Sequence, residues 1–88
     1  MNQPSVHTDV RTHLCDAMSV VAPDVVDEIA TIDAGLDFFE EFGLDSMDRL
    51  TIMERLVAST GVAIPDDVAV RLNTIEQLAA HLTAGGSG

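Results

Sequence analysis

A serine at the expected start of a helix is the residue best suited to chemistry in this sequence. Ser46 follows Gly43 and Asp45, and the spacing of apolar residues becomes helical from Ser46 onward. Asp45 is placed to act as the N-cap, and Gly43 lets the chain turn sharply just before the serine, so we expect the Ser46 hydroxyl to face solvent. An anionic group on the Ser46 hydroxyl would lie at the positive end of the helix dipole, an interaction of about 0.3 to 1 kcal/mol. The site therefore suits a phosphodiester substituent.

Ser46 is poorly equipped to act as a nucleophile itself. No histidine or lysine lies near it in the sequence to serve as a general base. We therefore expect Ser46 to be modified by another protein and expect the chain to be no enzyme. Taken alone, an Asp-Ser pair at a helix start is common, and simple capping would explain it.

The remaining chemically active residues do not form a recognisable metal or disulfide motif. The histidines, His7, His13 and His81, lack cysteine or carboxylate partners at a metal-binding rhythm. A calcium loop counted from Asp33 or Asp37 would place a phenylalanine at the position reserved for glycine. Cys15 is the only cysteine, so no internal disulfide can form. We predict no metal site and a reducing, cytoplasmic setting.

The charge of the chain is strongly negative. Fifteen acidic residues stand against four arginines, which gives a formal net charge of −11 at pH 7. Such a surface repels nucleic acids and anionic membranes, so neither is an expected partner. The acidity either serves solubility or steers the protein toward basic surfaces of partner enzymes. No leader or membrane-spanning segment is indicated, and we expect a soluble monomer.

The length of 88 residues allows one small domain, and its apolar spacing predicts an all-α fold. A first amphipathic helix, with Ser5 or Thr8 as its N-cap, is expected from the helical spacing of Val6, Val10, Leu14, Met18 and Val21. Pro23 interrupts this pattern, and a long ordered loop is expected from there to Asp45. The apolar residues that should anchor that loop in the core are Val25, Ile29, Leu36, Phe38, Phe39 and Phe42.

The second half of the chain should supply two principal helices and one short helix. Met47, Leu50, Met53, Leu56 and Val57 form the apolar stripe of a helix that begins at Ser46 and ends at Gly61. A short helix is expected from about Pro65 to Leu72, and a capping box over 74–77 starts the last helix. Residues 85–88 contain no apolar side chain and are predicted to be a flexible tail or linker.

The arrangement around Ser46 resembles that of the acyl carrier protein family. The run Gly43-Leu44-Asp45-Ser46-Met47 is similar to the family signature Gly-x-Asp-Ser-Leu, with Met47 replacing the leucine. The segment 61–67 resembles the Gly and Ile-Pro-Asp turn that follows the second helix of the family, and 74–78 resembles the start of its last helix. The resemblance covers roughly residues 5–83.

This resemblance implies a small four-helix bundle over a carrier domain of residues 5–84, with a long first loop and a short third helix. It also implies that Ser46 receives 4'-phosphopantetheine from coenzyme A, transferred by a separate magnesium-dependent phosphopantetheinyl transferase. The terminal thiol of that group would carry acyl groups as thioesters between an acyl-loading enzyme, a ketosynthase and other biosynthetic enzymes. The second helix and its surroundings would form the partner-recognition surface, at Leu44, Asp45, Met47, Asp48, Arg49, Glu54 and Arg55, with Ile64 and Val68 flanking the arm.

Two arginines depart from the heavily acidic second helix of housekeeping fatty acid carriers. Arg49 and Arg55 either select a dedicated partner set or make exposed ion pairs one turn apart. The first interpretation favours a carrier for polyketide or other specialised acyl biosynthesis over one for fatty acid biosynthesis. A peptidyl or aminoacyl carrier of nonribosomal type is a close alternative, although such carriers more often show Gly-Gly-x-Ser. A different class is a non-enzymatic acidic helical interaction module in which Ser46 only caps a helix.

Overall fold

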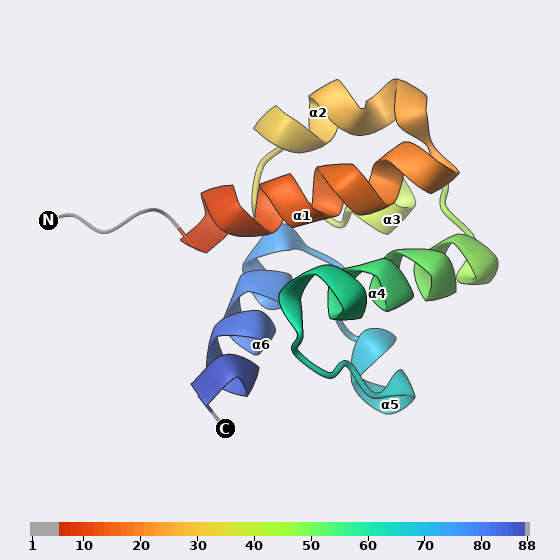
Figure 1. Cartoon of the computed structure of the whole chain (residues 1–88). Helices are drawn as coiled ribbons and strands as arrows, with labels where there is room; N and C mark the ends of the chain where they lie inside the picture. Colours follow the sequence, from red (N-terminus) through yellow and green to blue (C-terminus); the bar gives the residue numbers. More distant parts are fainter. Residues whose placement is uncertain (1–5, 88) are drawn as a thin grey trace, which may run out of the picture.

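The structure is a computed structural model that describes residues 6–87, and it is all-α, with no strand among those residues (Figure 1). The predicted fold class is therefore confirmed. The three longest helices are those that the apolar spacing predicts. In chain order the elements are α1 Val6–Val21, the 3-10 helix η1 Pro23–Val25, α2 Val26–Thr31, α3 Phe38–Glu41, α4 Ser46–Thr60, α5 Asp66–Ala69 and α6 Ile75–Ser87.

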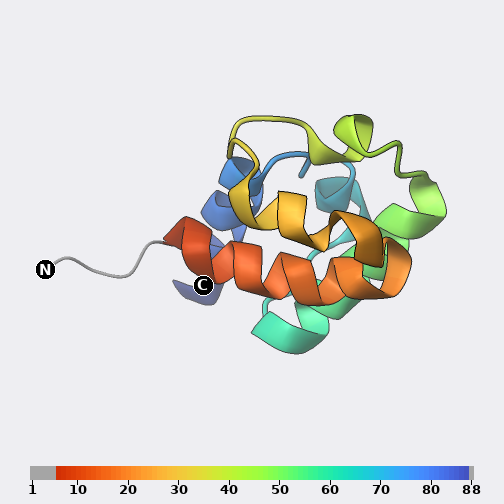
Figure 2. The ribbon, with the colours of Figure 1, turned by 90° about the horizontal axis from the view of Figure 1, so that it is seen from above.

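Helix α1 is the centre of the arrangement and packs against α2, α4 and α6. Figure 1 shows α2 along one side of α1 and α4 along the other, and Figure 2 shows from above that α1 and α2 lie side by side. Helix α1 can contact several neighbours because its apolar residues recur every three or four positions. Val10, Leu14, Ala17 and Met18 are all buried.

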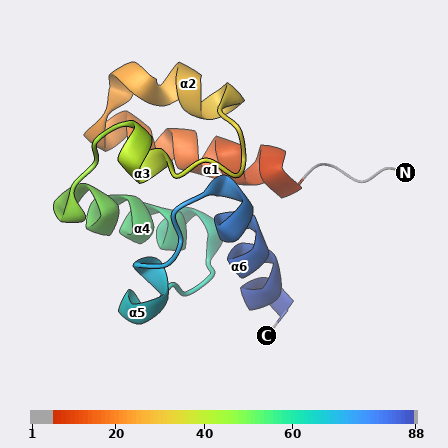
Figure 3. The same ribbon diagram turned by 180° about the vertical axis from the view of Figure 1, so that it is seen from behind.

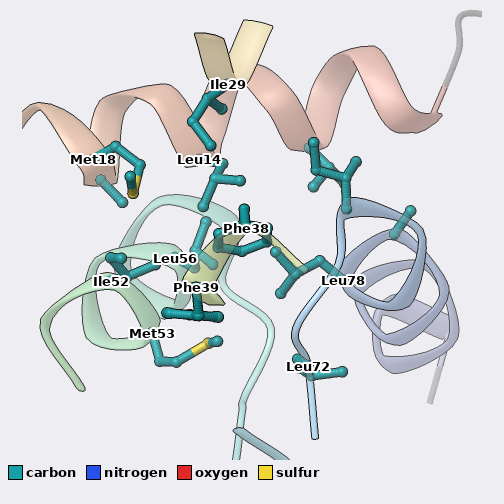
Figure 4. Close-up of a cluster of buried hydrophobic side chains, with 14 of the residues drawn as sticks. Leu14, Met18, Ile29, Phe38, Phe39, Ile52, Met53, Leu56, Leu72 and Leu78 are labelled. Carbon is teal, nitrogen blue, oxygen red and sulfur yellow. The ribbon is translucent and has the colours of Figure 1, made fainter. Parts of the chain in front are cut away.

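The core fills the space between α1, α4 and α6, and two phenylalanines of α3 are part of it (Figure 4). Phe38 is fully buried and Phe39 nearly so, with ring centroids 4.5 Å apart. Phe42 is half-buried and packs against the same cluster. The prediction that the phenylalanines, Val25 and Ile29 anchor the first connection in the core is confirmed, but Leu36, predicted with them, is exposed.

The prediction that the segment before Asp45 is a long loop without helices is wrong. This segment contains η1, α2 and α3. Helix α2 has six residues and only one buried side chain, Ile29, so it carries too few apolar positions to show a helical period. Contacts with α1 hold it in place instead. Arg11 Nη1 donates to Ile29 O at 2.9 Å, and Cys15 Sγ donates to Val26 O at 3.5 Å.

The two ends of the C-terminal half differ slightly from the prediction. Helix α5 stops at Ala69, and the chain continues to Leu72 in tight turns, with Leu72 N–H donating to Ala69 O at 3.3 Å. The capping box of α6 is confirmed: Thr74 Oγ1 accepts from Gln77 N at 3.0 Å, and Gln77 Oε1 accepts from Thr74 N at 3.2 Å. Helix α6 continues to Ser87, so its backbone is helical in most of the segment predicted as a tail. Of the predicted boundaries, residues 5 and 88 lie outside the described part.

Candidate functional site

Ser46 is the first residue of α4, and its side chain is exposed, as the sequence predicts. Asp45 is the N-cap: its Oδ1 accepts from Asp48 N at 2.9 Å, and Asp48 Oδ2 accepts from Asp45 N at 3.3 Å. This reciprocal capping box holds the first turn of the helix and engages both carboxylates with backbone donors. Among the backbone hydrogen bonds of the described residues, none is donated by the N–H groups of Ser46 or Met47, as is usual in the first turn of a helix.

The turn before Ser46 depends on a glycine in the left-handed region. Gly43 has φ 65°, and a Cβ placed there would meet nothing within 4 Å. The turn is closed by Leu44 N–H, which donates to Phe39 O at 2.8 Å, and the half-buried Leu44 packs against the core. Leu44 therefore anchors the loop to the core, while the space beside Gly43 is open. This arrangement leaves the Ser46 hydroxyl accessible.

A mainly apolar groove of about 560 Å³ lies beside Ser46, between α4 on one side and α5 with its preceding loop on the other. Figure 3 shows that α5 lies beside α4, on the side of α4 that faces away from α1. Three apolar side chains at this groove are largely exposed, with 67% of Met47, 47% of Leu50 and 61% of Val70 accessible. Contiguous exposed apolar surface of this kind indicates a binding site. The lining residues are Ser46, Met47, Arg49, Leu50, Met53, Glu54, Val57, Ile64, Asp66, Ala69 and Val70.

The groove corrects part of the predicted apolar stripe of α4. Met53 and Leu56 are buried as expected, but Met47 and Leu50 lie exposed in the groove rather than in the core. The spacing of these residues could not separate the two environments, because both sets fall on neighbouring faces of one helix. Val70 also lines the groove, and nothing in its local sequence distinguishes it from a core residue.

Arg49 is not the free surface charge that the sequence suggests. Its half-buried guanidinium donates from Nη1 to Ala69 O at 2.9 Å and from Nη2 to Asn73 Oδ1 at 2.7 Å. It also lies over the Phe39 ring, with Cζ 3.9 Å from the centroid. Arg49 is therefore half-buried and bonded across the groove rather than paired with an exposed charge along α4, and because it lines the groove its role in partner recognition stays a prediction.

The other residues predicted for recognition lie in several different environments. Met47, Glu54 and Ile64 line the groove with Ser46, while the exposed Arg55 lines, together with Glu54, a second hollow between α1 and α4. Val68 is half-buried and packs against the core. Asp45 is exposed, whereas Leu44 and Asp48 are half-buried at the start of α4.

Two further titratable side chains have structural partners. His81, expected to be solvated, is half-buried and its Nε2 lies 2.9 Å from Ala63 O, so it ties α6 to the loop before Ile64. Burial raises the pKa of the Cys15 thiol above its ordinary value. Within residues 6–87, no three His, Cys, Asp or Glu side chains gather where they could hold a metal ion. None of the helices described is long and apolar enough to cross a bilayer.

Comparison with known proteins identifies the family. The family model described as "Phosphopantetheine attachment site" matches residues 9–82, which include Ser46 and all the groove residues. The acyl carrier protein of Thermosynechococcus vestitus is 31% identical over 78 residues, which cover 89% of this chain and 88% of that protein. This chain belongs to the acyl carrier protein family.

A second curated protein matches only part of this carrier. Erythronolide synthase EryA2 of Saccharopolyspora erythraea is 41% identical over 46 residues, covering 52% of this chain but only 1% of that much longer protein. No solved structure matches the carrier. The prosthetic group of the carrier family is 4'-phosphopantetheine, as the description of the matching family states.

The residues around Ser46 fit this prosthetic group. The exposed hydroxyl at the start of a 15-residue helix offers an attachment point where a phosphodiester meets the positive end of the helix dipole. Asp45 and Asp48 are close, but both carboxylates already accept backbone N–H bonds. The apolar groove begins at Ser46, so a long substituent on the serine has an apolar surface beside it.

Proposed function

We propose that Ser46 is the attachment residue for 4'-phosphopantetheine and that the protein is a non-enzymatic acyl carrier. The observation that carries this proposal is the exposed Ser46 hydroxyl at the start of α4, next to an apolar groove. When bound, the prosthetic group supplies a terminal thiol on which acyl groups are held as thioesters. Because the transfer is carried out by a separate transferase, the proposal does not require a general base beside Ser46 in this chain.

Intact mass measurement tests the attachment residue. The protein is incubated with coenzyme A, magnesium and a broad-specificity phosphopantetheinyl transferase. The wild-type chain is expected to gain the mass of one phosphopantetheine, and Ser46→Ala none. Ser59→Ala is the matched control, because Ser59 is exposed near the other end of the same helix and should leave modification intact. An unmodified wild-type chain would favour the alternative, an acidic interaction module in which Ser46 only caps α4.

We propose that partner enzymes recognise the surface around Ser46. Exposed apolar and acidic side chains there offer both contact area and charge to basic enzyme surfaces. The expected partners are a phosphopantetheinyl transferase, an acyl-loading enzyme and a ketosynthase, met by a cytoplasmic monomer. The surface consists of Leu44, Asp45, Met47, Asp48, Arg49, Glu54, Arg55, Ile64 and Val68.

We propose further that the carrier serves polyketide or other specialised acyl assembly. The similarity to part of a polyketide synthase supports this proposal, as does Arg55, an exposed positive charge on α4. The similarity to an acyl carrier protein keeps fatty acid synthesis as the second candidate, and a peptidyl carrier is the third. Arg49 is half-buried and bonded to Ala69 and Asn73, so Arg55 is the better-exposed of the two positive charges for this choice.

Arg55→Glu tests the choice of partner. Because an exposed charge acts mainly on association rate, reversing it should speed transfer to a fatty acid ketosynthase and slow transfer to a polyketide ketosynthase. Both changes should shrink as salt is raised, since salt screens exposed charges. Rates are measured with the loaded carrier by mass spectrometry, with Arg71→Glu as the control because Arg71 is exposed outside α4. Unchanged rates with both ketosynthases would remove Arg55 from the proposal.

A further inference from the structure

The wall of the groove formed by α5 has little packing of its own. Helix α5 has four residues, of which only Ala69 is buried, and its N-cap Pro65 makes no side-chain capping bond. Asp66 and Val70, which line the groove, are both exposed. Val68 is half-buried against the core as well, but a single helical turn with so little buried apolar surface is held weakly, and polar contacts add to its stability.

Arg49 supplies two of those contacts from the opposite wall. It lies three residues after Ser46 on α4, and its guanidinium donates to Ala69 O, the last carbonyl of α5, at 2.9 Å. The second donor, Nη2, reaches Asn73 Oδ1 at 2.7 Å. The Phe39 ring beneath the guanidinium limits its movement. Hydrogen bonds from a charged donor are stronger than neutral ones, and the fork of arginine can hold both acceptors at once.

Asn73 is itself fixed from two other directions. Its backbone O accepts from Phe38 N at 3.1 Å, which connects it to α3. Its backbone N–H donates to Gln77 Oε1 at 2.8 Å, which connects it to the first turn of α6. Arg49 therefore joins α4 to the end of α5 through an anchor that the rest of the fold holds in place.

We propose that Arg49 is a positioning residue that holds α5 against α4 and thereby limits how far the groove beside Ser46 opens. A population of carriers with α5 displaced would accept longer or bulkier apolar groups, and the bonds of Arg49 keep that population small. The identity of those groups as acyl chains attached through Ser46 rests on the proposed function. Arg49 thus sets an upper limit on acyl-chain size.

The first test uses the unmodified protein and hydrogen exchange. In Arg49→Gln, the amides of Val70, Arg71 and Leu72, which close the end of α5, should exchange about tenfold faster than in the wild type, as expected for the loss of about 1.4 kcal/mol of local stability. The amides of α1 should be unaffected. Arg55→Gln is the matched control, since it removes the same charge from an exposed position of α4. Equal exchange of these amides in all three proteins would overturn the proposal.

A second variant separates a local effect on α5 from a general loss of stability in Arg49→Gln. Asn73→Ala removes one acceptor of the guanidinium but keeps the backbone bonds to Phe38 and Gln77. It should also speed exchange at the end of α5 without speeding it in α1. Faster exchange that spreads equally to α1 in both variants would contradict a local role for Arg49.

The limit on chain size has its own readout. Carriers loaded with acyl chains of increasing length are treated with hydroxylamine, which cleaves thioesters that the groove does not shield. Arg49→Gln should move the best-protected length toward longer chains, and Arg49→Lys, which keeps the charge, should restore part of the wild-type preference. An identical length profile in wild type and Arg49→Gln would refute the limit. Failure to modify Ser46 would refute the proposed function instead, while the exchange result would still decide whether Arg49 holds α5.

Discussion

Two nucleophilic side chains of this carrier lie in opposite environments. The Ser46 hydroxyl is exposed at the start of α4, whereas the Cys15 thiol is half-buried on α1 with its Sγ 3.5 Å from Val26 O. Burial raises the pKa of Cys15, Asp27 adds to that rise, and the positive charge of Arg11 opposes it. The thiolate is the reactive form of cysteine, so Cys15 should be far less reactive than an exposed thiol.

We predict that iodoacetamide at neutral pH alkylates the thiol of the modified carrier and leaves Cys15 largely unreacted. Alkylation of Cys15 should rise only as the pH climbs toward its raised pKa. Because the folded-state pKa is the higher one, the native state should also lose stability as the pH rises from the unfolded-state pKa through the folded-state pKa. Peptide mass spectrometry against time measures the first effect. Cys15 reacting as fast as a cysteine in the urea-unfolded chain would contradict the prediction.

At the scale of the elements, local capping decides where the principal helices of the second half begin. Helices α4 and α6 both start with reciprocal capping boxes, at Asp45 with Asp48 and at Thr74 with Gln77. Helix α4 ends at Gly61, whose φ of 76° lies in the left-handed region that favours glycine. These signals involve residues within four positions of one another, so they act before any tertiary contact forms.

Thr74→Ala should lower the free energy of unfolding by about 1 kcal/mol, because it removes the acceptor of Gln77 N–H at the start of α6. Urea unfolding followed by circular dichroism measures the change. Thr83→Ala, an exposed position later in the same helix, should change stability by less than about 0.5 kcal/mol. Equal losses in the two variants would show that the Thr74 cap contributes nothing special.

At the scale of the whole molecule, α1 connects the other principal helices to one core. Leu14 and Met18 are fully buried between them, and Figure 4 shows Leu14 directed toward the interior where Phe38 and Leu56 lie. A domain of this size has only about 5 to 15 kcal/mol of net stability. The loss of a single large core side chain is therefore a substantial fraction of the total.

Leu14→Ala should cost about 2 to 5 kcal/mol, since it removes apolar contacts and leaves a cavity at the centre of the core. Val20→Ala is the matched control on the same helix, because 51% of Val20 is exposed, and it should cost less than about 0.5 kcal/mol. Thermal unfolding of both variants compares them. If Leu14→Ala lost no more stability than Val20→Ala, the claim that Leu14 lies at the centre of the core would be contradicted.

The sequence by itself determined the all-α class, the three principal helices, the turn at Gly43 and the exposure of Ser46. Each of these features depends on residues that are close together in the chain. They are the apolar spacing within one helix, a capping residue with its partner, and the glycine whose turn leaves Ser46 exposed. For the same reason, the run 43–47 together with the segments 61–67 and 74–78, each a local motif, indicated the carrier family from the sequence.

The tertiary structure alone decided the short helices of the first connection, the groove beside Ser46 and the role of Arg49. Helix α2 is held by contacts with α1, and the groove needs α5 to be placed against α4. From the sequence, Arg49 looks like a surface charge. Only the fold shows that it bonds to Ala69 and Asn73, which are 20 and 24 residues away in the chain. Such contacts depend on the packing of distant segments, which leaves no periodic or capping signal in the local sequence.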